Sequence, residues 1–461
     1  MTRLALGDEM LERKLYARLL QWKSQKRRKA LCISGARQVG KTTLIRQFGK
    51  EQYKHFVEIN FLNDPLSKTI FSGSLRPQEL LANLTAYVRQ PLEIGNTLIF
   101  LDEIQECPQA RVAIKFLVED GRFDYIESGS LLGVSTKSVP SLPVGFEEPV
   151  TMYPLDFEEF CWANGVQKKT IELLHDAYLN KRPVSELIHE TMKKLFYSYL
   201  VVGGMPEAVN IFVSTNDIVQ VISFQREILA LYRQDIVKYS TQNSNKIHRI
   251  FDAIPGQLDE KNRRFTLSSL EKNARQNRYE SSFLWLNDAG VALACYNVTQ
   301  PTIPLKLNEK HNLFKLYLCD TGLLTAACAQ NIQFALLNGD VSVNWGSILE
   351  NAVAQQLLAN GFPLRYFNSI RHGEVDFVVE KNGKVLPVEV KSGKSFKLHA
   401  ALNNVLDVKD WGISEAVVLC QGNVDSDERI LYLPWYMVMF LKADQLPSQW
   451  LHRVDIGALA V

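Results

Sequence analysis

The chain has 461 residues, of which 46% are hydrophobic, 22% charged and 10% aromatic, as is typical of a folded globular protein with about three domains. This composition excludes an intrinsically disordered chain, a collagen and a disulfide-stabilised scaffold. The net charge is only +2, so any site for nucleic acid has to be a local basic patch.

Cysteine usage and hydropathy indicate the cellular compartment. The seven cysteines are scattered and form no Cys-x-x-Cys pair, so we expect buried reduced thiols and no zinc site. Charged residues interrupt the N-terminal segment, which argues against a signal peptide. No apolar run approaches the ~18 residues of a membrane-spanning helix. The chain is therefore predicted to be cytoplasmic, without a membrane partner.

The first part of the chain alternates short apolar strands with helices. An amphipathic helix is predicted over residues 1–29. Strands are expected at residues 30–34, 55–60, 97–101 and 125–128, and helices from residue 42, at 77–89 and at 109–119. This alternation is typical of a parallel sheet with helices on both faces. The predicted fold class is thus α/β, with a P-loop-type sheet domain over residues 1–165.

Three further regions are predicted after this sheet domain. Residues 166–240 are almost entirely helical in pattern and are expected to form a lid. Residues 241–335 follow a winged-helix pattern, with helices at 265–276 and 279–287 and strands at 291–298 and 313–318. Residues 336–461 mix a helix at 346–360, a hairpin of strands 373–381 and 384–391 across Asn382-Gly383, a strand at 410–421 and a helix at 436–441.

A glycine-rich phosphate loop is the clearest motif. The run from Gly35 to Thr42 matches G-x-x-x-x-G-K-T and lies between a predicted strand and a predicted helix, as phosphate binding requires. Its backbone amides would surround a phosphate, Lys41 would bridge the β- and γ-phosphates, and Thr42 would bind Mg²⁺. The predicted nucleotide-binding residues are Gly35, Ala36, Arg37, Gln38, Val39, Gly40, Lys41, Thr42 and Thr43.

An acidic pair follows the predicted strand at 97–101. A buried strand would deliver Asp102 and Glu103 to the carboxyl edge of the sheet, beside the phosphate loop. Asp102 is predicted to hold Mg²⁺, and Glu103 to orient and deprotonate the attacking water, which favours hydrolysis over kinase-type transfer. Without the phosphate loop, such a pair would more often be a helix cap or a solvated turn.

The strand at 125–128 leads into two further hydroxyl groups. Ser128 and Ser130 are candidates for sensing the γ-phosphate, although an ordinary turn explains the Ser-Gly-Ser run equally well. No arginine finger can be assigned; Arg122 and Arg233 are candidates that no pattern supports. The chain lacks an Asn/Thr-Lys-x-Asp motif in the right place, which disfavours GTP as the nucleotide.

Several motifs together resemble the prokaryotic AAA-type ATPases that carry a DUF4143 C-terminal region. These motifs are residues 35–43, 98–103, 128–130, 153–160, 203–207, 317–322 and 346–350, so the resemblance covers nearly the whole chain. It implies a P-loop ATPase core, a winged-helix-like middle and a restriction-endonuclease-like C-terminal fold. Many relatives carry a Gly-Arg before the segment at 153–160, but Pro143–Pro149 lacks that arginine.

The C-terminal region contains a second group of acidic residues. Glu389 and Lys391 share one face of a predicted strand because side chains alternate along a strand, and Asp376 lies on the strand paired with it. Glu350, from the preceding helix, is expected to converge there. Glu350, Asp376 and Glu389 would bind one or two Mg²⁺ ions, and Lys391 would orient or activate a water for phosphodiester cleavage. The alternative is a solvated strand face, which the apolar neighbours of Asp376 disfavour.

The winged-helix region offers a candidate DNA-binding surface. Its basic residues are Lys261, Arg263, Arg264, Lys272, Arg275, Arg278, Lys306, Lys310 and Lys315. The helix at 279–287 is nevertheless rich in large apolar residues, which suits packing against another domain at least as well as base reading.

The sequence as a whole predicts an Mg²⁺-dependent ATPase that couples ATP hydrolysis to domain rearrangement. In one hypothesis it is a DNA-processing or defence enzyme with a C-terminal nuclease. In the alternative it is a signalling or scaffolding ATPase whose C-terminal fold is catalytically silent and binds a partner or nucleic acid. Either another subunit or a partner is expected to supply the missing arginine finger, and the first case would make the protein a homo-oligomer.

Overall fold

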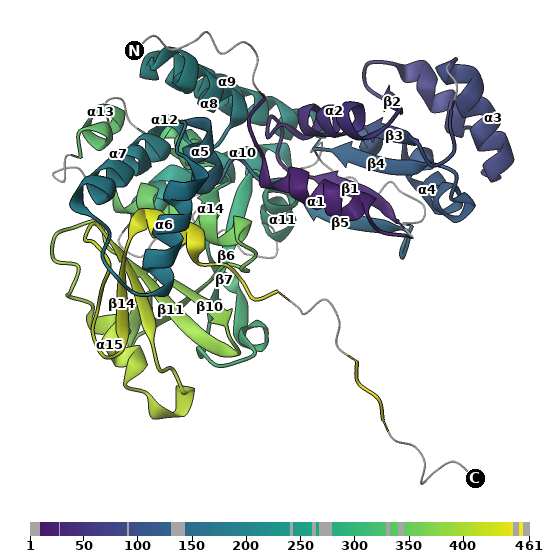
Figure 1. Cartoon of the computed structure of the whole chain (residues 1–461). Coiled ribbons are helices and arrows are strands. Elements are labelled where there is room, and N and C mark those ends of the chain that lie inside the picture. Colours follow the sequence, from purple (N-terminus) through teal and green to yellow (C-terminus); the bar gives the residue numbers. More distant parts are fainter. Residues whose placement is uncertain are drawn as a thin grey trace, which may run out of the picture.

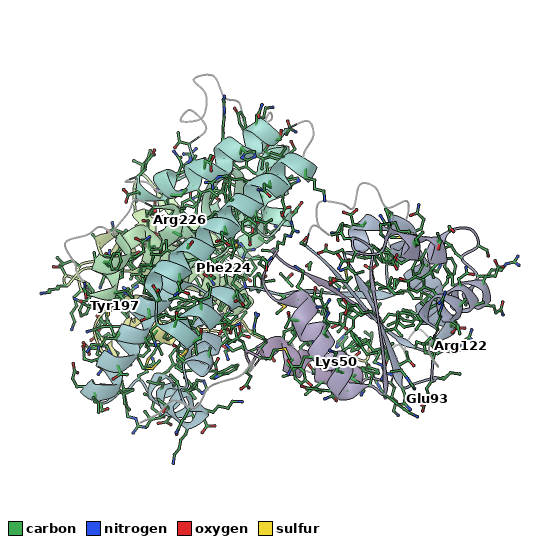
Figure 2. All side chains as sticks on the ribbon, turned by 90° about the horizontal axis from the view of Figure 1, so that it is seen from above. Lys50, Glu93, Arg122, Tyr197, Phe224 and Arg226 are labelled. Carbon is green, nitrogen blue, oxygen red and sulfur yellow. The ribbon has the colours of Figure 1, made fainter. Side chains whose placement is uncertain are left out.

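A computed structural model describes residues 10–26, 28–89, 92–130, 143–239, 243–260, 264–266, 279–328, 332–339, 345–445 and 451–454. The N-terminal sheet with α3 (Pro77–Val88) and α4 (Pro108–Asp120) lies at one end of the molecule, and the C-terminal strands lie at the other (Figure 1). Figure 2 shows the molecule from above. Lys50, Glu93 and Arg122 lie in the part that contains the N-terminal sheet, and Tyr197, Phe224 and Arg226 lie in the helical part that follows it. No helix within these ranges combines the length and hydropathy needed to cross a membrane.

The N-terminal sheet is fully parallel, in the order β2-β3-β4-β1-β5. Its strands are β1 (Ala30–Ser34), β2 (His55–Asn60), β3 (Thr97–Asp102), β4 (Asp124–Gly129) and β5 (Glu147–Thr151). Leu31 and Ile33 face one apolar core, whereas Ala30 and Cys32 face the other, because side chains alternate along a strand. This two-sided burial explains why the strands read as continuous apolar runs, and it confirms the predicted α/β class.

Helices cover both faces of this sheet. The first core packs against α1 (Lys14–Lys23) and α2 (Lys41–Gln52), and the second against α3 and α4. Two 3₁₀ segments, η1 (Pro65–Phe71) and η2 (Ile104–Glu106), complete the connections. The helix predicted over residues 1–29 is shorter in the structure: Arg13 is extended, and residues 1–9 lie outside the described ranges.

Strand β5 was not predicted from the sequence. Its residues, Glu-Glu-Pro-Val-Thr, contain no apolar run, and Pro149 is a residue that sheets accept mainly at their edges. The strand nevertheless pairs with β1 over its whole length, at the edge of the sheet. Edge position thus explains both its polar composition and the missed prediction.

The region after the sheet is helical, as predicted. Its helices are α5 (Phe157–Ala163), α6 (Lys168–Leu179), α7 (Glu186–Val202), α8 (Pro206–Thr215), α9 (Ile218–Tyr239) and α10 (Ser244–Asp259). The segments Lys181-Arg-Pro183 and Gly203-Gly-Met205 separate α6 from α7 and α7 from α8.

The middle region contains α11 (Glu280–Asp288), β6 (Ala292–Val298), η6 (Leu305–Asn308), β7 (Glu309–Leu318), α12 (Thr321–Ala327) and α13 (Ile332–Leu337). β6 and β7 form the predicted antiparallel hairpin. The first helix of the predicted winged-helix pair, at 265–276, lies mostly outside the described residues. The hairpin is not the wing of a separate domain, because β6 also pairs with β8 (Arg365–Ser369) of the C-terminal region. The resulting sheet, β7-β6-β8-β9, crosses the predicted boundary at 335/336.

The C-terminal region is built around a second five-stranded sheet, in the order β10-β11-β12-β14-β13. Its elements are α14 (Gly346–Ala359), β9 (Gly373–Val375), β10 (Phe377–Lys381), β11 (Lys384–Val390), α15 (Ala400–Leu406), η7 (Lys409–Trp411), β12 (Ala416–Cys420), β13 (Asp425–Ser426), β14 (Ile430–Pro434) and η8 (Trp435–Phe440). The hairpin turn across Asn382-Gly383 has positive φ at both residues, as its sequence predicts.

Three C-terminal predictions need correction. The strand expected at 373–381 is interrupted at Asp376, and its two parts belong to different sheets. The strand expected at 410–421 is limited to β12, and the final helix is the 3₁₀ segment η8. Strands β8, β13 and β14 were not predicted.

Candidate functional site

The phosphate loop joins the end of β1 to the start of α2. Gly35 and Gly40 have φ angles of 146° and 92°, and Gln38 also adopts a positive φ, of 70°. A methyl group on Gly35 would lie 2.2 Å from the carbonyl oxygen of Met152, so only glycine fits at that position. The strained backbone at Gln38, a non-glycine residue, is typical of a functional loop.

Lys41 lies at the first position of α2 and is almost fully buried. Its Nζ atom donates hydrogen bonds of 2.9 Å to the carbonyl oxygens of Gly35 and Ala36. Burial lowers the pKa of Lys41 to about 8, although the Glu103 and Asp102 carboxylates favour its charged form. The loop therefore surrounds the Lys41 amino group, and burial there makes its charged form less stable relative to the neutral form than in an exposed lysine.

Asp102 is the centre of a hydrogen-bond cluster at the carboxyl edge of the sheet. Its carboxylate accepts a 3.1 Å bond from the Thr42 hydroxyl, a short bond from the Ser128 hydroxyl and a 2.9 Å bond from the Asn60 side chain. Register explains this convergence, because Asn60, Asp102 and Ser128 are aligned on the neighbouring strands β2, β3 and β4. Asn60 was missed by the sequence analysis; its position at the end of a strand was the available signal.

Glu103 follows β3 directly. Its backbone is left-handed, with φ of 53°, and its carboxylate accepts a hydrogen bond from the Gln105 side chain. Such a conformation costs a non-glycine residue free energy and is found most often at functional sites. Ser130 lies one residue beyond β4, at the same edge of the sheet. The edge thus gathers Lys41, Thr42, Asp102, Glu103 and Ser128 around one loop.

A pocket of about 230 Å³ adjoins the loop and was not predicted. It lies between the N-terminal segment, the first turns of α2 and the start of α8, and its lining residues are Met10, Leu11, Arg13, Gln38, Gly40, Thr43, Leu44, Gln47, Pro206, Glu207 and Asn210. Arg13 fixes the N-terminal segment by donating to the Val39 carbonyl at 2.9 Å and to the Tyr153 carbonyl at 2.6 Å. Two sequence motifs contribute to it: the phosphate loop supplies Gln38, Gly40 and Thr43, and the motif at 203–207 supplies Pro206 and Glu207.

The two arginines considered as fingers are paired with neighbouring acids. Arg122 binds Asp120 at 2.7 Å, and Arg233 binds Asp252 at 2.8 Å. Neither contact brings the guanidinium group to the phosphate loop of the same chain.

In the C-terminal region, Asp376, Glu389 and Lys391 come together. The Asp376 carboxylate accepts a 2.8 Å bond from the backbone of Val390, and Lys391 Nζ lies 2.7 Å from Glu389 Oε1. Burial, and to a lesser extent the Asp376 carboxylate, raise the pKa of Glu389 to about 7, against the opposing effect of Lys391. Three of the four predicted residues therefore form one electrostatically coupled group.

Glu350 is engaged in a different contact. It is fully buried on α14 and accepts hydrogen bonds from Lys315 Nζ, at 2.9 Å, and from the Tyr317 hydroxyl. Lys315, also fully buried, lies 2.7 Å from Glu374 as well. Within the ranges that the structure describes, no three acidic, histidine or cysteine side chains are arranged to hold a metal ion. Glu350 is thus paired with Lys315, whereas Asp376 and Glu389 are grouped with Lys391.

The candidate DNA surface is only partly visible. Lys261, Arg263, Lys272, Arg275 and Arg278 lie outside the described residues. Among the others, Lys315 is buried and cannot contact DNA, and Lys306 is paired with Glu309 at 2.9 Å. On α11, the side chains of Phe283, Trp285 and Leu286 are buried in the main core. The packing interpretation of this helix is therefore the one that the structure supports.

A parallel sheet that carries this loop and places an Asp-Glu pair beside it defines a P-loop ATPase fold. Family models match the chain as an AAA domain at residues 27–161, a domain of unknown function (DUF8612) at 193–333 and a domain of unknown function (DUF4143) at 345–437. The chain thus carries an AAA domain and a DUF4143 domain, as the sequence resemblance implied. The DUF8612 match spans most of the helical region as well as the middle region.

Matches among solved structures include a Walker-type ATPase of Pyrococcus abyssi, which is 13% identical with a TM-score of 0.41 over 69% of this chain and 96% of that one. The Orc1 protein of Aeropyrum pernix, solved in complex with DNA, is 12% identical with a TM-score of 0.29 over 72% and 94%. The RuvB Holliday junction branch migration motor of Thermotoga maritima is 15% identical with a TM-score of 0.28 over 64% and 91%. At these scores, the three structures carry no argument about function. No curated protein matches the chain.

Proposed function

We propose that the protein binds ATP together with Mg²⁺ and hydrolyses it, and that nucleotide state changes the arrangement of the regions that follow the AAA domain. The observation that carries this proposal is the convergence of Lys41, Thr42, Asp102 and Glu103 at one loop. Lys41 would neutralise the β- and γ-phosphate oxygens, and the amides after Ser34 would donate to them. Glu103 would orient the attacking water and accept its proton.

The donor set at Asp102 fits a magnesium ion. A hydroxyl and a carboxylate are the hard oxygen ligands that Mg²⁺ prefers, and Thr42 and Asp102 already lie within hydrogen-bond distance of each other. When bound there, the ion would neutralise charge on the phosphates. Asn60 and Ser128 would hold the Asp102 carboxylate in place, and Ser128 and Ser130 remain candidates for contact with the γ-phosphate.

The pocket beside the loop is the proposed site of the nucleoside. It is continuous with Gly40 and Thr43, so a nucleotide whose phosphates occupy the loop would direct its base toward α8. The pocket has a volume of about 230 Å³. Leu11 and Pro206 give it an apolar wall, and Gln47 and Asn210 supply hydrogen-bonding groups. This combination suits a flat heterocycle with polar edges.

Calorimetric titration with ATP and Mg²⁺ across pH tests this proposal. Because phosphate favours the charged ammonium, bound ATP raises the pKa of Lys41, whose value in the free protein is about 8. Affinity should therefore be constant below pH 8 and fall by up to about tenfold per pH unit above it, with proton uptake on binding. A Lys41→Arg variant should lose this pH dependence.

Failure to bind ATP would overturn the proposal, and an affinity that is unchanged between pH 7 and pH 9.5 would remove Lys41 from the phosphate site.

For the C-terminal region, the geometry favours the silent alternative over the nuclease. Lys315 and Tyr317 both donate to the Oε1 atom of Glu350, a residue that a nuclease would need as a metal ligand. We therefore propose that this region binds a partner, with DNA as a candidate, and does not cut phosphodiesters.

Incubation of plasmid and single-stranded DNA with Mg²⁺ or Mn²⁺, with and without ATP, should give no cleavage. Metal-dependent cleavage that disappears in a Lys391→Ala variant would show instead that Asp376, Glu389 and Lys391 form a working nuclease site.

A further inference from the structure

Helix α9 contacts the phosphate loop directly, although more than 190 residues separate the two in sequence. Arg37 Nη1 lies 2.8 Å from Asp235 Oδ1, and the Tyr232 hydroxyl donates a 2.9 Å hydrogen bond to the Arg37 carbonyl oxygen. Tyr232 and Asp235 are three residues apart and therefore lie on the same face of α9. One turn of this helix thus holds both the side chain and the backbone of a single loop residue.

The Arg37 side chain lies close to the proposed phosphate site. It belongs to the loop between Gly35 and Gly40 whose amides would surround a phosphate. Its guanidinium group is near enough to the Lys41 ammonium to contribute to lowering the pKa of Lys41. Two cations at one loop make a site for a highly charged anion, and the Arg37 side chain is 40% exposed, which leaves it room to move.

Asp235 provides the anion that Arg37 binds in the structure. Its carboxylate is largely buried, with 12% of the side chain exposed, and it faces the loop from outside the AAA domain. A γ-phosphate arriving at Lys41 would bring a second, more highly charged anion toward the same guanidinium group. Because the carboxylate and the phosphate repel each other, Arg37 cannot hold both closely without a cost in free energy.

We propose that Arg37 exchanges Asp235 for the γ-phosphate when ATP binds, so that the ion pair between the loop and α9 is broken in the triphosphate state and formed in the diphosphate state. This inference rests on the proposed ATP site and adds to it a γ-phosphate ligand and the first step of coupling. α9 packs against α8, α10 and α12, so a weaker hold on α9 affects the middle of the molecule.

Affinities for ATP and ADP, measured separately by calorimetry, test the exchange. Asp235→Asn keeps the size of the side chain but removes the competing charge, so it should strengthen ATP binding by about tenfold and leave ADP binding unchanged. Arg37→Ala should weaken ATP binding by about tenfold, again without an effect on ADP. In the Arg37→Ala background, Asp235→Asn should have no further effect on either nucleotide.

The chain offers a matched control on the same helix. Arg233 and Asp252 form an exposed ion pair that joins α9 to α10 without involving the loop. Asp252→Asn removes an acid–arginine pair of the same kind and should change neither nucleotide affinity. If Arg37→Ala does not fold, Arg37→Lys serves as a milder variant. Like Arg37→Ala, it should lower the preference for ATP over ADP, but by a smaller factor.

Hydrogen exchange reports on the helix itself. Amides of residues 229–238 should exchange faster with ATP than with ADP in the parent protein, and this difference should vanish in Arg37→Ala. Equal shifts in ATP and ADP affinity, or additive effects in the double variant, would overturn the exchange while leaving the ATP site intact. A parent protein that binds neither nucleotide would instead overturn the proposed function, and the exchange with it.

Discussion

Lys41→Ala is expected to lower ATP turnover by at least about a hundredfold, the loss typical when a charge-stabilising group is removed from a reacting site. Lys41 is the ammonium group that the loop buries, and alanine would leave the carbonyl oxygens of Gly35 and Ala36 without their donor. ATP affinity should fall as well. Phosphate release by the purified protein measures the first effect, and calorimetry measures the second.

Two further variants make this result interpretable. Glu103→Gln should keep ATP binding but lower turnover by about a hundredfold, because an amide cannot accept the proton of the attacking water. Lys50→Ala removes an exposed lysine from the last turn of the same helix, far along from the loop, and should change neither quantity. If Lys41→Ala released phosphate at the parent rate, the site would be assigned wrongly; parent-like turnover in Glu103→Gln would remove only Glu103 from its role.

Gly204→Ala is expected to destabilise the fold by about 3 kcal/mol, at the upper end of the range for overpacking. A methyl group at this position would lie 2.0 Å from the carbonyl oxygen of Leu155, which is backbone and cannot turn away. The same segment is held by hydrogen bonds from Leu155 to the Gly204 carbonyl, at 2.7 Å, and from the Gly204 amide to Asp320, at 2.6 Å. All three groups would have to shift together.

Thermal unfolding of Gly204→Ala and Gly256→Ala provides the comparison. Gly256 lies in α10 with nothing within 4 Å of the added methyl group, so alanine there should stabilise the helix by about 0.5–1 kcal/mol. Opposite shifts in melting temperature are therefore expected from two chemically identical substitutions. A Gly204→Ala protein that melts with the parent would show that the segment at 203–207 can relax.

The parts of the fold that were predicted correctly are those with a strong local signal. The apolar strands β1 to β4, the loop from Gly35 to Thr42 and the acidic pair are each set by a few neighbouring residues. Parallel pairing then requires the ends of these strands to meet, which is why Thr42, Asp102 and Ser128 are in contact.

The parts that were missed depend on partners far away in the sequence. Lys315 was interpreted as a basic residue of the wing, yet it is buried against Glu350 and Glu374, and no local pattern marks that pairing. The polar edge strand β5 and the pocket beside the phosphate loop, which three separate segments line, also depend on distant partners. The sequence indicates which residues are candidates for chemistry, but not which of them form ion pairs with one another.

The position of β6 limits how this molecule can move. Its backbone is hydrogen-bonded to β7 on one side and to β8 on the other, so residues 292–318 and 365–369 can separate only by breaking a row of hydrogen bonds. Each of these contributes about 1 kcal/mol, and together they resist shear between the two stretches. A rearrangement that begins at the phosphate loop would therefore move the middle and C-terminal regions together.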